Sequence, residues 1–196
     1  MTAVRFTVLA AVALLAVGCD GSGRAGDPSS PVSRTISGPG GSALLSVGTN
    51  ARRVSVMDGC DLTTFNAAIG PGTCARNGGV HFQEFIAQLT AHQTAGAWHN
   101  APAQTDASLG ETLVAHNDGG ETHTFTRVAD FGGGFIDFLN QLAGTPVPAP
   151  ECLGLPAAEF MAPGGTDSEV LDTVGDIKYE CCIHPWMRTT VHVRGT

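Results

Sequence analysis

The residues with the clearest capacity for chemistry lie near the C-terminus, in the segment Cys181-x-x-His184-x-x-Met187. A further histidine, His123, lies much earlier in the chain. One thiolate, two imidazoles and a weak thioether are the ligands of a mononuclear blue-copper centre. Such a set binds both Cu(I) and Cu(II), so the metal can gain and lose one electron without leaving the site. The pattern therefore predicts a copper ion bound by Cys181, His123, His184 and Met187.

The elements around these residues must bring them together. Residues 176–181 and 189–194 have the composition and alternation of strands, which places the three C-terminal ligands on one tight loop between them. His123 lies in residues 122–128, another predicted strand. The metal would therefore connect parts of the fold that lie far apart in the sequence.

This arrangement resembles the cupredoxins, the family of plastocyanin, azurin and amicyanin. The Cys-x-x-His-Pro-aromatic-Met loop is most similar to that of amicyanin, and Asn117, six residues before His123, also matches the family. The similarity is closest in residues 113–125 and 179–193. It implies a Greek-key β-sandwich, a copper cofactor and electron transfer with a redox partner protein.

The resemblance also implies roles for residues that do not bind the metal. Thr124 would donate its backbone N–H to the Cys181 sulfur, and Asn117 would clamp the ligand loop. Pro185 and Trp186 would form an apolar rim beside an exposed edge of the loop histidine. The resemblance implies that this rim is the place where a redox partner docks.

Short strands and two short helices are predicted for the rest of the domain. Apolar residues at i, i+3, i+4 and i+7 predict a helix over residues 80–93, and similar spacing predicts another within residues 131–142. Further strands are predicted over residues 53–57 and 112–116, whereas residues 59–79 are predicted to be irregular. These elements favour an all-β fold, an antiparallel Greek-key β-sandwich with inserted short helices.

Four further cysteines are expected to form disulfides. Neighbouring residues on an extended backbone point to opposite sides, so Cys182 points away from a metal bound by Cys181. Four cysteines allow three pairings. The favoured pairing joins Cys60 to Cys74 and Cys152 to Cys182. The alternative is that Cys181 itself forms a disulfide and that the chain binds no copper.

The N-terminus has the features of an export signal. Residues 1–18 combine Arg5 with an apolar run too short to span a membrane, a pattern typical of secretory signals. The sequence before Cys19 resembles a bacterial lipobox, which implies lipidation of Cys19 and a periplasmic or cell-surface location; an ordinary signal cleaved nearby is the alternative. Residues 19–42, rich in Gly, Ser and Pro, predict a flexible linker, and residues 43–196 the folded domain.

Charge and composition limit the function. The chain has 10 Lys and Arg against 18 Asp and Glu, a net charge of −8. Nucleic acids and anionic membranes attract clustered positive charge, so neither is an expected partner apart from a lipid anchor.

The favoured function is a one-electron carrier without enzymatic turnover, since a copper enzyme would need a second metal centre. The alternative, a copper-delivery or buffering protein, would be richer in Met than four residues. Glu121 is expected to be solvated.

Overall fold

The computed structural model describes residues 51–195. The predicted signal segment, Cys19 and the linker lie outside these residues. None of the described helices has the length and apolar character needed to cross a membrane. The helices and strands, in chain order, are β1 (Ala51–Met57), α1 (Leu62–Ala68), α2 (Phe82–His92), β2 (His99–Ala101), β3 (Gln104–Ser108), β4 (Thr112–Asn117), β5 (Thr126–Val128), α3 (Asp137–Leu142), two 3-10 turns (Pro150–Cys152 and Ala157–Glu159), β6 (Thr166–Val170), β7 (Gly175–Glu180) and β8 (Arg188–Arg194).

Two four-stranded sheets form the sandwich, with strand orders β2-β1-β4-β6 and β3-β8-β7-β5. The predicted all-β sandwich with short inserted helices is confirmed. The sheets are mixed rather than purely antiparallel, because the β1–β4 and β3–β8 pairs are parallel. Parallel pairing requires a long crossover connection. The chain supplies one between β1 and β4, where it forms two helices and two strands.

Alternation of side chains buries one face of each sheet against the other. The buried positions include Leu113 and Ala115 of β4, and Val191 and Val193 of β8. All four belong to one hydrophobic cluster, which also contains Cys181. The core of the sandwich therefore extends to the loop that the sequence predicts to bind copper.

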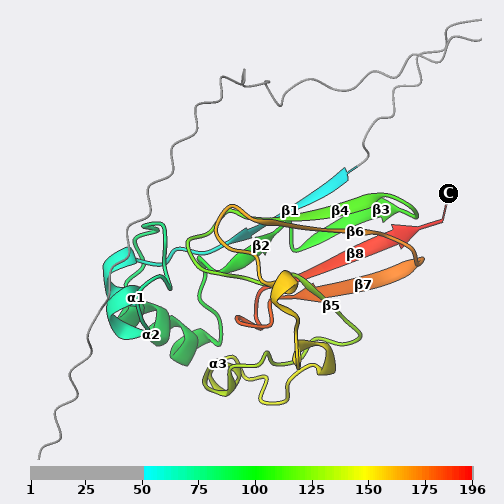
Figure 1. Ribbon diagram of the computed structural model, residues 1–196. Coiled ribbons are helices and arrows are strands. Elements are labelled where there is room, and N and C mark those ends of the chain that lie inside the picture. The colour runs from blue at the N-terminus through cyan, green and yellow to red at the C-terminus, as the bar shows by residue number, and fades with distance from the viewer. Residues whose placement is uncertain (1–50, 196) are drawn as a thin grey trace, which may run out of the picture. The chain divides into compact units, whose positions relative to one another are not determined.

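Helices α1 and α2 form an insertion between β1 and β2, at the end of the sandwich opposite the C-terminus (Figure 1). An aromatic cluster holds the insertion in place. The ring of Phe85 lies 4.5 Å from that of Trp98, and the ring of Phe65 lies 5.5 Å from Trp98. Phe85 also contacts Trp186, with ring centroids 6.0 Å apart. The insertion thus packs against the predicted ligand loop.

The helices differ from the predictions in part. The helix predicted over residues 80–93 is α2, but within residues 131–142 only α3 is helical. Helix α1 lies in a segment predicted to be irregular. It begins where Asp61 accepts a hydrogen bond from the backbone N–H of Thr64 at 2.8 Å. Only Phe65 of α1 is buried, so hydrophobic periodicity gave no signal for this helix.

The strands also differ from the predictions in part. Within residues 122–128 only β5 forms a regular ladder, because His123 leaves that sheet and pairs with Met161 instead. Strand β6 was not predicted. It lies at the edge of its sheet and has the polar sequence Thr-Asp-Ser-Glu-Val, which lacks the apolar alternation of a buried strand. Edge position therefore explains the absence of a sequence signal.

Candidate metal centre

Three predicted ligands converge at the end of the sandwich. The Sγ atom of Cys181 lies 3.7 Å from Nδ1 of His123 and 3.8 Å from Nδ1 of His184. The three ligand atoms all lie within 4.8 Å of one another, and all three residues are buried. Within residues 51–195, Cys181 is the only cysteine outside a disulfide. The structure therefore brings together a thiol and two imidazole nitrogens, as a metal site requires.

The ligand loop is closed by its own backbone. Strands β7 and β8 pair up to Glu180 and Arg188. Beyond that pair, the N–H of Cys181 donates to the carbonyl oxygen of Met187 at 3.0 Å, and the N–H of Met187 donates to the carbonyl oxygen of His184 at 2.9 Å. The Met187 side chain is fully buried and belongs to the same cluster as Cys181. Met187 is therefore held on the inner side of the loop.

Thr124 and Asn117 make contacts of the kind the resemblance implies. The backbone N–H of Thr124 lies 3.4 Å from the Cys181 sulfur and donates to it. The side-chain amide of Asn117 donates to the carbonyl oxygens of Glu121 and Met161, each at 2.8 Å. Met161 in turn pairs with His123. Asn117 therefore ties together the two segments that hold this histidine in place.

Asp58, which the sequence analysis did not select, is hydrogen-bonded to a predicted ligand. Its Oδ2 lies 2.8 Å from Nε2 of His123, on the side of the ring opposite Cys181. The carboxylate also accepts backbone N–H groups of Gly120 and Glu121, each at 2.8 Å. Burial raises the pKa of Asp58, but the hydrogen bonds from His123 and the backbone outweigh it and lower the pKa to about 2. Asp58 is therefore a buried, ionised carboxylate.

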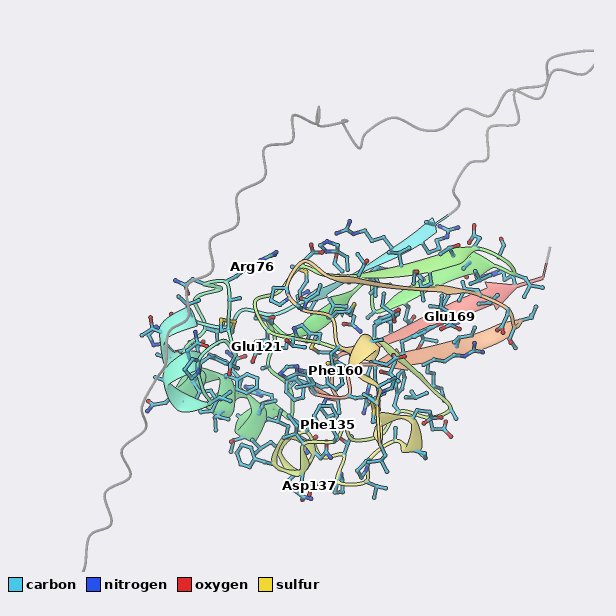
Figure 2. The ribbon with its side chains drawn as sticks, viewed as in Figure 1. Arg76, Glu121, Phe135, Asp137, Phe160 and Glu169 are labelled. Carbon is cyan, nitrogen blue, oxygen red and sulfur yellow. A yellow bond between two sulfur atoms is a disulfide. The ribbon has the colours of Figure 1, made fainter. Side chains whose placement is uncertain are left out.

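Glu121 is a second carboxylate at the site, and the expectation that it is solvated is wrong. Its Oε2 accepts the indole N–H of Trp98 at 2.6 Å and lies 3.6 Å from Nε2 of His184. Figure 2 shows Glu121 on the side of the sandwich that faces α1 and α2. Burial raises the pKa of Glu121, against the attraction of His184 and the hydrogen bond from Trp98. The insertion between β1 and β2 helps to bury this residue, because Trp98, which lies between α2 and β2, donates to it.

The electrostatics of the site favour a thiolate. Burial raises the pKa of Cys181, but the hydrogen bonds and charges of His123 and His184 outweigh it and lower that pKa well below its ordinary value. Burial lowers the pKa of His123, but Asp58 and Cys181 outweigh it and raise that pKa to about 9. A thiolate and two imidazoles with a buried thioether nearby fit copper, because soft sulfur ligands of both kinds select it.

The residues of the predicted docking rim are less exposed than expected. The sequence analysis expected an exposed edge of His184, but this residue is only 3% exposed. Pro185 is also buried, and Trp186 is half-buried. The ring of Phe85 from α2 lies 6.4 Å from that of His184. The insertion therefore covers the face through which the loop histidine would have reached solvent.

The disulfides have the pairing favoured from the sequence. Cys60 pairs with Cys74 in the insertion, and Cys152 pairs with Cys182. The second bond attaches the turn at Pro150–Cys152 to the residue that follows Cys181. Cys182 thus points away from the metal-binding group, as alternation on an extended chain requires.

No family model matches the chain, and no curated protein matches it. Solved structures that are similar to it include a purple cupredoxin from Nitrosopumilus maritimus, at 16% identity over 73% of this chain and 99% of that one, with a TM-score of 0.41. An oxidised plastocyanin from Dryopteris crassirhizoma has 13% identity over 72% and 99% of the two chains, with a TM-score of 0.37.

An oxidised amicyanin mutant is also similar, at 14% identity over 76% of this chain and 88% of that one, with a TM-score of 0.37. All three structures are named as cupredoxins or as members of the group that the ligand loop resembles. Because the identities and TM-scores are low, the functional conclusion depends on the side chains of this chain.

Proposed function

We propose that the chain binds one copper ion at a mononuclear type 1 site and carries one electron. The observation that supports this most strongly is the convergence of Cys181 Sγ with Nδ1 of His123 and His184 in a buried group. Met187, on the same hydrogen-bonded loop, is the proposed axial ligand. When bound, copper would supply the Cu(II)/Cu(I) couple.

The residues around the proposed ligands would keep their geometry constant between the two oxidation states. Thr124 donates its N–H to the sulfur of Cys181, and its Oγ1 accepts the N–H of Cys182 at 2.8 Å. Asp58 holds the outer nitrogen of His123. Because ligands and supports are both hydrogen-bonded within a packed core, little reorganisation is expected on electron transfer.

The burial of the site supports a carrier over an enzyme or a delivery protein. His123 and Cys181 are fully buried, and His184 is nearly so. A copper enzyme must admit a substrate to the metal, and a delivery protein must release the ion readily. Electron transfer needs neither, because an electron crosses a few ångströms of protein without a ligand-exchange step.

We also propose that the protein is exported and anchored by a lipid on Cys19, and that it exchanges electrons with a partner protein. The pattern of residues 1–18 carries the export proposal. The two disulfides support it, because such bonds persist mainly in oxidising compartments.

Copper titration of the metal-free protein tests the proposed function. One equivalent of Cu(II) is expected to produce an intense thiolate-to-copper band in the visible range, bleached by ascorbate and restored by an oxidant. Absorption and EPR spectra measure this. Replacement of the exposed His99 by alanine should leave the band intact, because this residue lies outside the ligand group. Copper bound without the band would contradict a type 1 site.

A further inference from the structure

Both proposed ligand histidines have a carboxylate next to the ring nitrogen that faces away from the metal group. For His123 the partner is Asp58, with Oδ2 2.8 Å from Nε2. For His184 the partner is Glu121, with Oε2 3.6 Å from Nε2. The two carboxylates come from different segments, the end of β1 and the turn after β4. Together with the Cys181 thiolate, they place three acidic groups around the proposed copper site.

These carboxylates are fixed and desolvated. The side chain of Asp58 is 1% exposed and that of Glu121 is 7% exposed. Backbone N–H groups of Cys60, Gly120 and Glu121 donate to Asp58, so it cannot turn away from His123. Within residues 51–195, the ion pairs formed by either carboxylate involve only the two histidines, and no Lys or Arg neutralises them.

We propose that Asp58, supported by Glu121, is a positioning residue that biases the site towards Cu(II). An ionised carboxylate that accepts the Nε2 proton makes the imidazole a stronger donor. Its negative charge, in a buried region of low dielectric constant, also interacts more favourably with the doubly charged ion. The reduction potential is therefore low for this ligand set, and the reduced protein is a strong electron donor. This inference depends on the proposed function.

The test replaces Asp58 by asparagine, which keeps the size and removes the charge. The affinity for Cu(II) is expected to fall about 10- to 100-fold, with a smaller change for Cu(I). Each tenfold fall in the affinity for Cu(II) relative to that for Cu(I) raises the reduction potential by about 59 mV. Spectroelectrochemical titration measures the potential. Glu121→Gln should act in the same direction more weakly, because its carboxylate is 3.6 Å away.

Asp130→Asn is the matched control, because it removes one exposed acidic charge that is paired with Lys178. Its potential should equal that of the original protein. An unchanged potential in Asp58→Asn, with the visible band intact, would overturn this inference and leave the copper site standing. Absence of the band in the original protein would instead refute the site itself. In the metal-free protein, NMR should show a slowly exchanging Nε2 proton on His123 that exchanges faster in Asp58→Asn.

A different observation concerns the route by which an electron reaches the surface. His184 is covered by α2, but the backbone next to Cys181 leads outward. The N–H of Phe135 donates to the carbonyl oxygen of Cys182 at 2.9 Å. A side chain at Gly134 would collide with that same oxygen, so the two segments are in direct contact. The backbone of Cys182 and one hydrogen bond therefore connect Cys181 with Phe135, whose side chain is partly in solvent.

Phe135 and Phe160 pack together, and two further exposed apolar residues lie on adjoining segments: Phe138 in α3, and Val147, whose backbone is hydrogen-bonded to that of Gly133. We call these four residues the Phe135 patch. Phe135, Phe138 and Val147 are 40%, 58% and 74% exposed, and the ring of Phe160 lies 5.8 Å from that of Phe135. Figure 2 shows Phe160, Phe135 and Asp137 in succession on the α3 side. The patch thus offers the apolar contact surface that the rim around His184 lacks.

The charges beside the Phe135 patch are acidic. Asp137 is exposed and lies between Phe135 and Phe138 in the sequence, and Glu159 precedes Phe160. Burial raises the pKa of Glu159, and the negative charges of Asp167 and Glu169 raise it further. Glu169 is itself paired with Arg127 at 2.7 Å, so Asp137, Glu159 and Asp167 are the acidic residues that matter here. We infer that the Phe135 patch is the docking surface for a redox protein with an apolar contact area and a basic margin.

Stopped-flow oxidation of the reduced, copper-loaded protein by a mitochondrial cytochrome c, a basic redox protein, tests this inference. Phe135→Ser is expected to lower the second-order rate constant about tenfold, the effect of losing about 1.4 kcal/mol of encounter-complex stability. The rate should also fall as salt concentration rises.

Val174→Ser is the matched control, because Val174 is an exposed apolar residue just before β7. Equal rates for the two variants, or no salt effect, would overturn the docking surface. The visible band tests the copper site separately.

Discussion

Replacement of Cys181 by serine is expected to abolish the intense visible band of the copper-loaded protein completely. The band is a transition from thiolate sulfur to Cu(II), and a serine oxygen offers no such transition at visible energies. The site lacks a second thiol to take over, because Cys181 is the only cysteine outside a disulfide within residues 51–195. Absorption spectroscopy after addition of one equivalent of Cu(II) measures the loss.

The matched control removes two other cysteines. A variant with both Cys152→Ser and Cys182→Ser lacks the neighbouring disulfide but retains the Cys181 thiolate. It should keep the band while losing about 2–5 kcal/mol of stability, a typical cost of removing a native disulfide. A band that survives in Cys181→Ser, or that disappears in the double variant while the fold is intact by circular dichroism, would contradict the ligand assignment.

Replacement of Phe85 by alanine is expected to lower the free energy of unfolding by about 3–5 kcal/mol, the range for a buried phenylalanine. Phe85 is 2% exposed, and its ring packs on those of Phe65, Trp98 and Trp186. The change leaves a cavity where the insertion meets the ligand loop. Urea denaturation of the metal-free protein, followed by tryptophan fluorescence, measures it.

The same substitution should uncover His184, because the Phe85 ring is part of its cover. Gln83→Ala, on the exposed side of α2, is the control and should change stability by less than about 0.5 kcal/mol. If Phe85→Ala were as stable as this control, the aromatic cluster would not anchor the insertion.

The ligand loop was predictable because its information is local. Cys181, His184 and Met187 lie within seven consecutive residues, and strand patterns flank them on both sides. A hairpin of this kind brings its own residues together, whatever the rest of the fold does. His123 required an additional inference, since its place depends on pairing with Met161 rather than on a regular strand. The combination of one cysteine, two histidines and one methionine nevertheless predicted a copper site.

The cover and the charge of the site were not predictable in this way. Asp58 and His123 are 65 positions apart, and Trp98 and Glu121 are 23 apart. Nothing in the local pattern around Asp58 distinguishes it from the other acidic residues. The prediction for Glu121 was wrong for the same reason, because its burial depends on an insertion that the family pattern does not contain.

Side-chain chemistry and short spacing were thus sufficient to identify a thiolate, two imidazoles and a thioether, to favour a β-sandwich and to favour the disulfide pairing that the structure has. Only the folded chain reveals that α2 covers His184 and that two buried carboxylates lie behind the histidines. The physical reason is that a ligand's donor atom belongs to the residue itself. Its burial, hydrogen bonds and surrounding charge come from segments that meet only in the tertiary structure.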